Sequence, residues 1–142
     1  MTYDEIQAQP EWILRHVAWT FAGKCYESRA EFEDDVTQES LELSNLGATE
    51  LEPWIPEQIV LRASVVRIAY DYWDDDEIAQ SELLLHADNG ESFTAAEILY
   101  KINNAVVDQL RDHDHQFFEG LWFGETNQEP GQTPLYYMVL GS

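Results

Sequence analysis

Positive charge is scarce in this chain. Seven Lys and Arg stand against 28 Asp and Glu, which gives a formal net charge of −21 over 142 residues. Binding to a nucleic acid backbone depends on basic side chains that displace counterions from the phosphates. The bases are scattered singly, and nucleic acid is therefore not an expected partner: Arg15, Lys24, Arg29, Arg62, Arg67, Lys101 and Arg111.

Cysteine and long apolar runs are also missing. Cys25 is the only cysteine, which excludes an intramolecular disulfide and a cysteine-based zinc site. No segment approaches the roughly 20 apolar residues of a membrane span. The acidic start, Met1 to Glu5, lacks the positive and apolar regions of a secretory signal. We therefore expect a cytoplasmic protein with no membrane partner.

Hydrophobic and aromatic residues are plentiful, at 44% and 13% of the chain. Disorder driven by charge requires few residues of these kinds, so the composition predicts one folded acidic α+β domain over 1–142. Solubility needs a net charge of only about 2–8 in a small domain, and the excess acid indicates a basic partner. The alternative is a cell whose proteins are acidic throughout because its cytoplasm is acidic or rich in salt.

Hydrophobic periodicity and capping residues predict seven elements. Ser28 with Glu31, and Thr94 with Glu97, have the spacing of capping boxes that begin helices. The predicted strands are 12–21, 59–73, 81–87, 116–123 and 135–140, and the predicted helices are 29–43 and 94–110. The segment 12–21 also fits a helix that begins at Pro10. An irregular step near Ser64 indicates a bulge, and Asp88-Asn89-Gly90 indicates a turn.

The second predicted helix has the clearest pattern in the chain. Its apolar residues recur at helical spacing and predict one buried stripe: Ile98, Leu99, Ile102, Ala105, Val106 and Leu110. The order β-α-β-β-α-β-β predicts an α+β fold with a mostly antiparallel sheet and both helices on one face. A ferredoxin-like variant with an additional strand has this order.

The first acidic cluster lies on the first predicted helix. Between Glu27 and Glu57 the chain has ten acids and one base, Arg29. Like charges four residues apart on a helix each cost about 0.2–0.5 kcal/mol, and folding alone gives no reason for them. We therefore predict that Glu31, Asp34 and Asp35 bind a basic partner. The alternative is a solvated helix face.

The second acidic cluster places large aromatic residues beside carboxylates. Arginine can stack on such rings and pair with such acids, as in a binding hot spot. The predicted partner-binding residues are Tyr72, Trp73, Asp74, Asp75, Asp76 and Glu77. Alternatively, the aromatic side chains face the core and the acids end a hairpin.

Metal and cofactor sites are not predicted. Counted from Asp71, the third and sixth positions of an EF-hand loop are Trp73 and Asp76, where a ligand and a glycine are needed. A weak cation site remains an alternative there. His113 and His115 could ligate a metal with Asp112, but a polar turn after a helix, with the imidazoles near the C-terminal end of its dipole, is the favoured interpretation.

Catalytic motifs are absent as well. The chain has no glycine-rich phosphate loop, HExxH or GxSxG sequence. Acidic surroundings raise the pKa of a thiol and make Cys25 a poor nucleophile. Two facing carboxylates, as in an acid-catalysed hydrolase, remain a weak alternative. We therefore expect a protein that is not an enzyme.

Together these features predict a small acidic protein that neutralises or inhibits a basic protein partner. An immunity protein or antitoxin, which masks a basic toxin, is the favoured interpretation. The alternatives are a nucleic-acid mimic that inhibits a DNA- or RNA-binding protein, and an acidic housekeeping domain with no charge-driven partner.

Overall fold

A computed structural model describes residues 10–15, 17, 19–21, 23–45, 54–74, 77–110, 117–123 and 133–141. It has an α+β fold, as predicted, with two helices in the described part of the chain. The elements are β1 (Trp12–Ile13), β2 (Trp19–Thr20), α2 (Arg29–Asn45), β3 (Ile59–Leu61), β4 (Val65–Asp74), β5 (Glu77–His86), β6 (Phe93–Thr94), α3 (Ala95–Leu110), β7 (Phe117–Phe123) and β8 (Leu135–Gly141).

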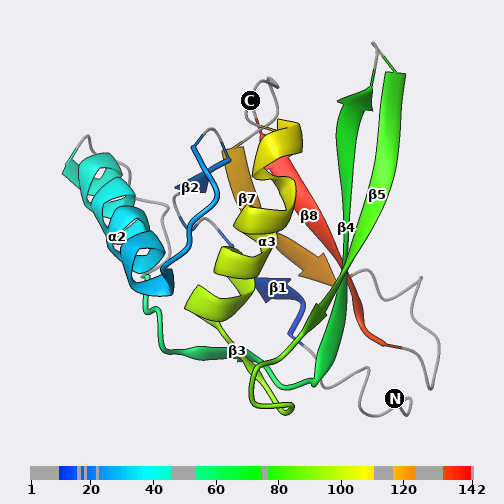
Figure 1. Ribbon diagram of the computed structural model, residues 1–142, viewed down its shortest axis with the longest axis horizontal. Helices are drawn as coiled ribbons and strands as arrows, with labels where there is room; N and C mark the ends of the chain where they lie inside the picture. Colours follow the sequence, from blue (N-terminus) through cyan, green and yellow to red (C-terminus); the bar gives the residue numbers. More distant parts are fainter. Residues whose placement is uncertain are drawn as a thin grey trace.

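The main sheet is mostly antiparallel, with the strand order β1-β7-β8-β4-β5 and with β2 also paired to β7. Only the β4–β8 pair is parallel among the described strands. Helix α3 lies over the sheet, and α2 packs outside it, next to α3 and β2 (Figure 1). The acidic helix is therefore an outer layer of the molecule.

The predicted ferredoxin-like variant is wrong. The strand that follows α2 is β3, which lies outside the main sheet and pairs with β6 in a separate two-stranded sheet. Helix α2 therefore does not connect two strands of the main sheet, as the predicted order requires. The described part of the chain has eight strands, with helices after the second and the sixth.

The predicted strand over 12–21 is broken into β1 and β2. Leu14 has a φ of 56°, and the Val17 N–H donates to the Leu14 carbonyl at 3.2 Å. Trp19 stands seven positions after Trp12, whereas their partners on β7 are only four positions apart. The hydrogen bond between Val17 and Leu14 closes a turn between the two short strands. The left-handed backbone of Leu14 costs about 1–2 kcal/mol and is held there by burial of its side chain.

The predicted strand over 59–73 is also interrupted. The chain leaves β3 after Leu61, and β4 begins at Val65, so the irregular step near Ser64 marks a change of sheet. The return strand β5 begins at Glu77, four residues before the predicted start at Ser81. Strands β4 and β5 form a long hairpin with continuous register from Val65–His86 to Asp74–Glu77.

The turn after β5 has the predicted chemistry, whereas the capping box predicted at the start of α3 is only half formed, because the Glu97 carboxylate accepts the Asp88 N–H at 2.7 Å. The Asn89 side chain accepts the Glu91 and Ser92 N–H groups at 2.8 and 2.9 Å, and Gly90 has a φ of 73°. Helix α3 is capped by Thr94, whose Oγ1 accepts the Glu97 N–H at 3.2 Å. These local interactions orient α3 over the sheet.

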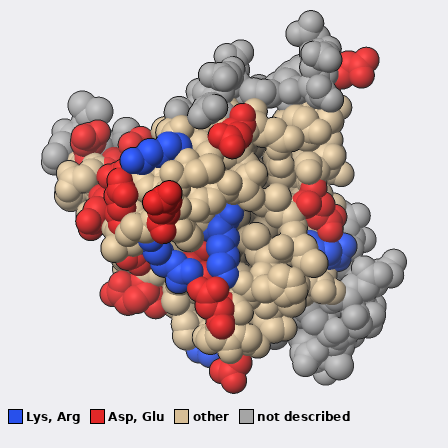
Figure 2. All heavy atoms as spheres, viewed as in Figure 1, with Lys and Arg blue, Asp and Glu red and all other residues tan. Residues whose placement is uncertain are grey.

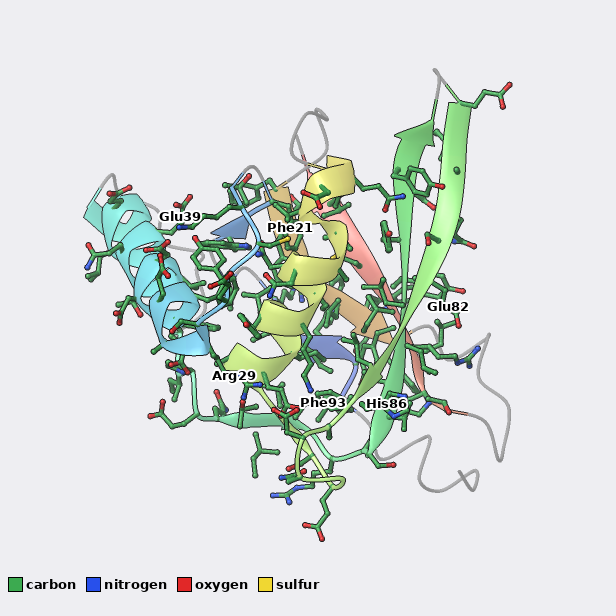
Figure 3. All side chains as sticks on the ribbon, viewed as in Figure 1. Phe21, Arg29, Glu39, Glu82, His86 and Phe93 are labelled. Atoms are coloured by element: carbon green, nitrogen blue, oxygen red, sulfur yellow. The ribbon has the colours of Figure 1, made fainter. Side chains whose placement is uncertain are left out.

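The apolar stripe of α3 is confirmed except at one position. Ala105 is exposed, whereas Val107 and Asn103 are buried with the rest of the stripe. Asn103 tolerates complete burial because its side chain accepts the Trp19 Nε1 proton at 3.1 Å and donates to the Lys24 carbonyl at 3.0 Å. Phe21 and Phe93 lie in the same interior (Figure 3).

Helix α2 is attached to the core by few side chains. It begins after Ser28, whose Oγ accepts the Glu31 N–H at 3.3 Å, and Phe32 and Val36 are its completely buried apolar residues in the described part. The Phe32 ring lies edge-on to Trp19, Tyr26 and Tyr100, with centroids 5.0, 5.3 and 5.7 Å away. Most of its remaining described surface is polar or acidic, with Leu41 as an exposed apolar residue.

Candidate partner-binding surfaces

The first candidate surface is the acidic stripe of α2, which comprises Glu31, Asp34, Asp35 and Glu42. These residues have the spacing i, i+3, i+4 and i+11, which places them on one side of a helix. All four are exposed, and acidic side chains gather over α2 with few basic ones among them (Figure 2). The prediction that this helix carries an acidic face is consistent with this placement.

Half of the acidic stripe has partners within the chain. Glu31 forms an ion pair with Lys24 at 3.1 Å, and Asp35 accepts the Tyr26 hydroxyl proton at 2.5 Å. Burial, and then this hydrogen bond, raise the pKa of Tyr26 far above its usual range. Within the described residues, Asp34 and Glu42 have no hydrogen bond or ion pair. They are available to a partner.

Glu39, a further acid of α2, is destabilised in its ionised form. Its side chain is half-buried beside the stripe (Figure 3), and burial raises the pKa of Glu39, with a further contribution from the charge of Glu42. A raised carboxyl pKa means that the folded state disfavours the ionised form. The acidic helix is therefore retained at some expense of stability.

Basic side chains are largely engaged with the chain's own acids and rings. Arg29 contacts Asp88 at 2.7 Å, and Arg67 lies 3.9 Å from Glu82. Lys101 contacts Asp88 and Glu97, each at 2.8 Å. The Arg15 guanidinium lies 4.7 Å from the centre of the Trp12 ring. Apart from Lys24, these bases do not neutralise the acidic stripe.

Asp88 is the centre of a structural ion network. Hydrogen bonds from Lys101 and then Arg29 lower the pKa of the Asp88 carboxyl. Burial alone lowers the pKa of Lys101, but its hydrogen bonds to Asp88 and Glu97 outweigh burial and raise it. This network joins the start of α2 to α3 and the end of β5, where Lys101 also donates to the His86 carbonyl at 2.6 Å. The carboxylates of Asp88 and Glu97 therefore hold elements of the fold together.

The second predicted cluster lies on the β4–β5 hairpin. Tyr70 is buried and donates its hydroxyl proton to Gln109 of α3. Tyr72 is half-buried, packs against the core and lies 6.0 Å from the Tyr70 ring. Glu77 is exposed at the start of β5. The side chains of Trp73 and Asp74, and the whole of Asp75 and Asp76, lie outside the described residues.

Two aliphatic residues on β5 were missed by the sequence analysis. Ile78 and Leu84 are 65% and 59% exposed, the largest values among the described large hydrophobic residues. They share the outer face of the hairpin with Gln80, Glu82 and His86, of which Glu82 and His86 are labelled in Figure 3. The exposure of side chains alternates along β5. The sequence conceals this alternation, because the run Leu83-Leu84-Leu85 places leucine on both faces. Helix α3 separates this face from α2 (Figure 1).

The groups considered as metal ligands or nucleophiles in the sequence lie apart or outside the described residues. No group of three His, Cys, Asp or Glu there could hold a metal, and Asp112, His113 and His115 lie outside them. Cys25 is exposed, with its Sγ 3.5 Å from the Asn104 carbonyl. A pocket of about 220 Å³ between β1 and β3 is lined by Gln58 and apolar residues: Trp12, Ile13, Leu14, Val17, Ile55, Ile59, Val60 and Ala95.

Comparison with known proteins gives no relative: no family model, curated protein or solved structure matches the chain. Among the described residues, no helix has both the length and the apolar character needed to cross a membrane.

Proposed function

We propose that this chain is a small acidic binding protein that neutralises or inhibits a basic protein partner, in the manner of an immunity protein or antitoxin. The observation that carries the proposal is the unequal use of charge. Five of the six bases in the described residues are engaged with acids or rings of the same chain, and only Arg62 among them is not. Asp34 and Glu42 of the acidic stripe, by contrast, are exposed with no partner in the described residues. A basic protein surface supplies the missing charge.

The acidic stripe of α2 and the outer face of the β4–β5 hairpin would affect different rates of such a complex. Exposed acids attract a basic partner over long distances and raise the association rate. Exposed apolar side chains such as Ile78 and Leu84 lose water on contact and slow dissociation. A purely electrostatic nucleic-acid mimic has no need of those aliphatic side chains, and this favours a packed protein interface.

The test compares two doubly neutralised proteins. Asp34→Asn with Glu42→Gln removes two charges from the acidic stripe, and Glu91→Gln with Glu119→Gln removes two exposed charges elsewhere. Each protein is immobilised and exposed to lysate of the cells that encode it, at low and at high salt. We expect the wild type to retain a basic protein that salt releases, because screening shortens the range of attraction from roughly 30 Å at 0.01 M to 3 Å at 1 M.

The stripe variant should retain less of that protein than the control variant. Expression of the recovered protein alone should arrest growth, and co-expression of the wild-type chain should restore it. Recovery of nucleic acid instead of protein, or equal retention by the two variants, contradicts binding through the stripe. Growth arrest that co-expression does not relieve contradicts the inhibitory role.

A further inference from the structure

Strand β5 is an open edge of the main sheet. It is the last strand of the order β1-β7-β8-β4-β5, and within the described residues it pairs with β4 alone. Its ten residues keep an unbroken register and include no lysine, arginine or proline. Natural proteins usually protect such edges with those residues, with bulges or with short strands. A long edge with unbroken register is suited to the addition of another strand.

Backbone hydrogen bonds define which groups of β5 face this edge. The Arg67 N–H donates to the Pro134 carbonyl at 2.9 Å, so the polar groups of Arg67 point towards β8 and away from β5. Opposed residues of an antiparallel pair exchange either both hydrogen bonds or none. Leu84, which opposes Arg67, therefore directs its N–H and C=O to the open edge.

The same geometry recurs at every second residue of β5. The residues whose backbone groups face the open edge are Ile78, Gln80, Glu82, Leu84 and His86. Their side chains all lie on the exposed outer face of the hairpin. The His86 carbonyl is taken by Lys101. From Ile78 to Leu84, backbone groups that have no partner within the described residues therefore lie along one edge, together with two exposed aliphatic side chains and a carboxylate between them.

We propose that the β5 edge binds an extended basic segment of the partner, which adds to the sheet as an antiparallel strand. The segment has an apolar residue opposite Leu84, a Lys or Arg opposite Glu82, a polar residue opposite Gln80 and an apolar residue opposite Ile78. Glu77, which is exposed at the start of β5, attracts a further basic residue. The inference rests on the proposed function, because it assumes that the partner is basic.

Charge distinguishes this occupant from a second copy of the chain. Two β5 strands could pair with Ile78 opposite Leu84 and Gln80 opposite Glu82, which satisfies the apolar positions. That register sets the two Glu82 side chains on a diagonal, about 7–8 Å apart, and brings together two chains of charge −21 each. A basic strand meets the apolar positions and also neutralises Glu82.

The probe is a fluorescent synthetic peptide with valine at the first and seventh positions of its central segment, arginine at the third and threonine at the others. A second peptide has the same composition but places the valines and arginine at successive positions, which destroys the period of two. Binding is measured by fluorescence anisotropy. We expect the patterned peptide to bind at least about tenfold more tightly than the second peptide. Only in the patterned peptide do both valines and the arginine lie on one face of an extended strand.

Two variants test the edge itself. Gln80→Pro removes an N–H that faces the open edge and leaves the β4–β5 hydrogen bonds in place, whereas Gln80→Thr keeps the N–H and is its control. Leu84→Ser removes an apolar anchor without changing the charge. Gln80→Pro and Leu84→Ser should each weaken the patterned peptide about tenfold or more. Circular dichroism melts establish whether each variant is folded. If Gln80→Pro is not folded, Leu84→Ser alone tests the edge.

Amide hydrogen exchange provides an independent readout. The edge-facing amides of Ile78, Gln80, Glu82 and Leu84 should gain protection when the patterned peptide binds. Peptides that bind equally well regardless of pattern, or that respond to Asp34→Asn with Glu42→Gln but not to Leu84→Ser, overturn the edge site and leave the proposed function standing.

Two other outcomes have distinct meanings. Retention of no basic peptide and no basic protein at low salt overturns both the edge site and the proposed function. A wild-type dimer that strengthens with salt and is dissolved by Gln80→Pro overturns the peptide site in favour of a second copy. Sedimentation at low and high salt measures this.

Discussion

At the scale of single residues, Asp88 shows how this acidic protein uses some of its carboxylates for stability. We expect Asp88→Asn to lower the free energy of unfolding at neutral pH by about 0.2–1 kcal/mol, the range for exposed ion pairs. The pKa of Asp88 is lower in the folded state than the usual value near 3.9. Its contribution is therefore complete above that value and is lost as the pH falls through the folded pKa.

Urea unfolding of the wild type and the variant at pH near 7 and near 2.5 measures this difference. The two free energies should converge at the lower pH. Glu91→Gln, in the same turn, is the control and should have little effect at either pH, because Glu91 is exposed and its side chain contacts no base within the described residues. An Asp88→Asn effect that persists unchanged at low pH contradicts the assignment.

At the scale of elements, Leu14 decides that the first apolar segment is two strands and not one. Its side chain is buried, so Leu14→Ala and Leu14→Gly should each destabilise the protein by roughly 2–5 kcal/mol. Glycine is ordinarily the worse substitution by about 0.5–1 kcal/mol. Here we expect the opposite order, because glycine relieves the φ of 56° and alanine does not.

Denaturant melts of the two variants test this order. Leu99, which is buried in the interior of α3, provides the control pair, in which the glycine variant should be the less stable one. A Leu14→Gly variant that is clearly less stable than Leu14→Ala would show that no strain is released at this position.

At the scale of the whole molecule, the net charge of −21 opposes compactness. We expect the free energy of unfolding to rise as sodium chloride increases from about 0.01 M to about 1 M, since screening weakens repulsion among 28 acids more than attraction to seven bases. Asp34→Asn with Glu42→Gln should stabilise the protein at low salt, and this gain should shrink at high salt. Thermal melts across the salt series measure both effects.

Stability that falls with salt would contradict this expectation and would mean that the internal ion pairs outweigh the repulsion. The Glu91→Gln with Glu119→Gln variant controls for net charge. This control variant should gain less stability at low salt than the stripe variant. Glu42 lies one helical turn from the like charge of Glu39, whereas Glu91 and Glu119 are not on a helix and have no such neighbour.

Local chemistry explains which parts of the fold could be predicted. Both helices begin near the predicted residues because Ser28 and Thr94 cap them through neighbouring N–H groups. The exposed position of Ala105 could not be predicted, because alanine suits either face of a helix. The burial of Asn103 could not be predicted either, since it depends on Trp19, which is 84 residues away in sequence.

The candidate surfaces divide in the same way. Helical periodicity alone placed Glu31, Asp34 and Asp35 on one face, and the structure adds that Glu31 and Asp35 have internal partners. The hairpin was predicted with its acids near the turn, but the period of two could not show that Tyr72 packs inwards. It also could not show that β5 ends the sheet.

The sequence by itself determined the charge, the α+β class, the helix starts and the acidic face of α2, because each depends on composition or on contacts within one helical turn. Only the tertiary structure decided that the segment 12–21 breaks at Leu14, that β3 leaves the main sheet, and that Ile78 and Leu84 lie on an open edge. Strand order depends on contacts between segments far apart in the chain, and no local pattern encodes which strand remains without a neighbour.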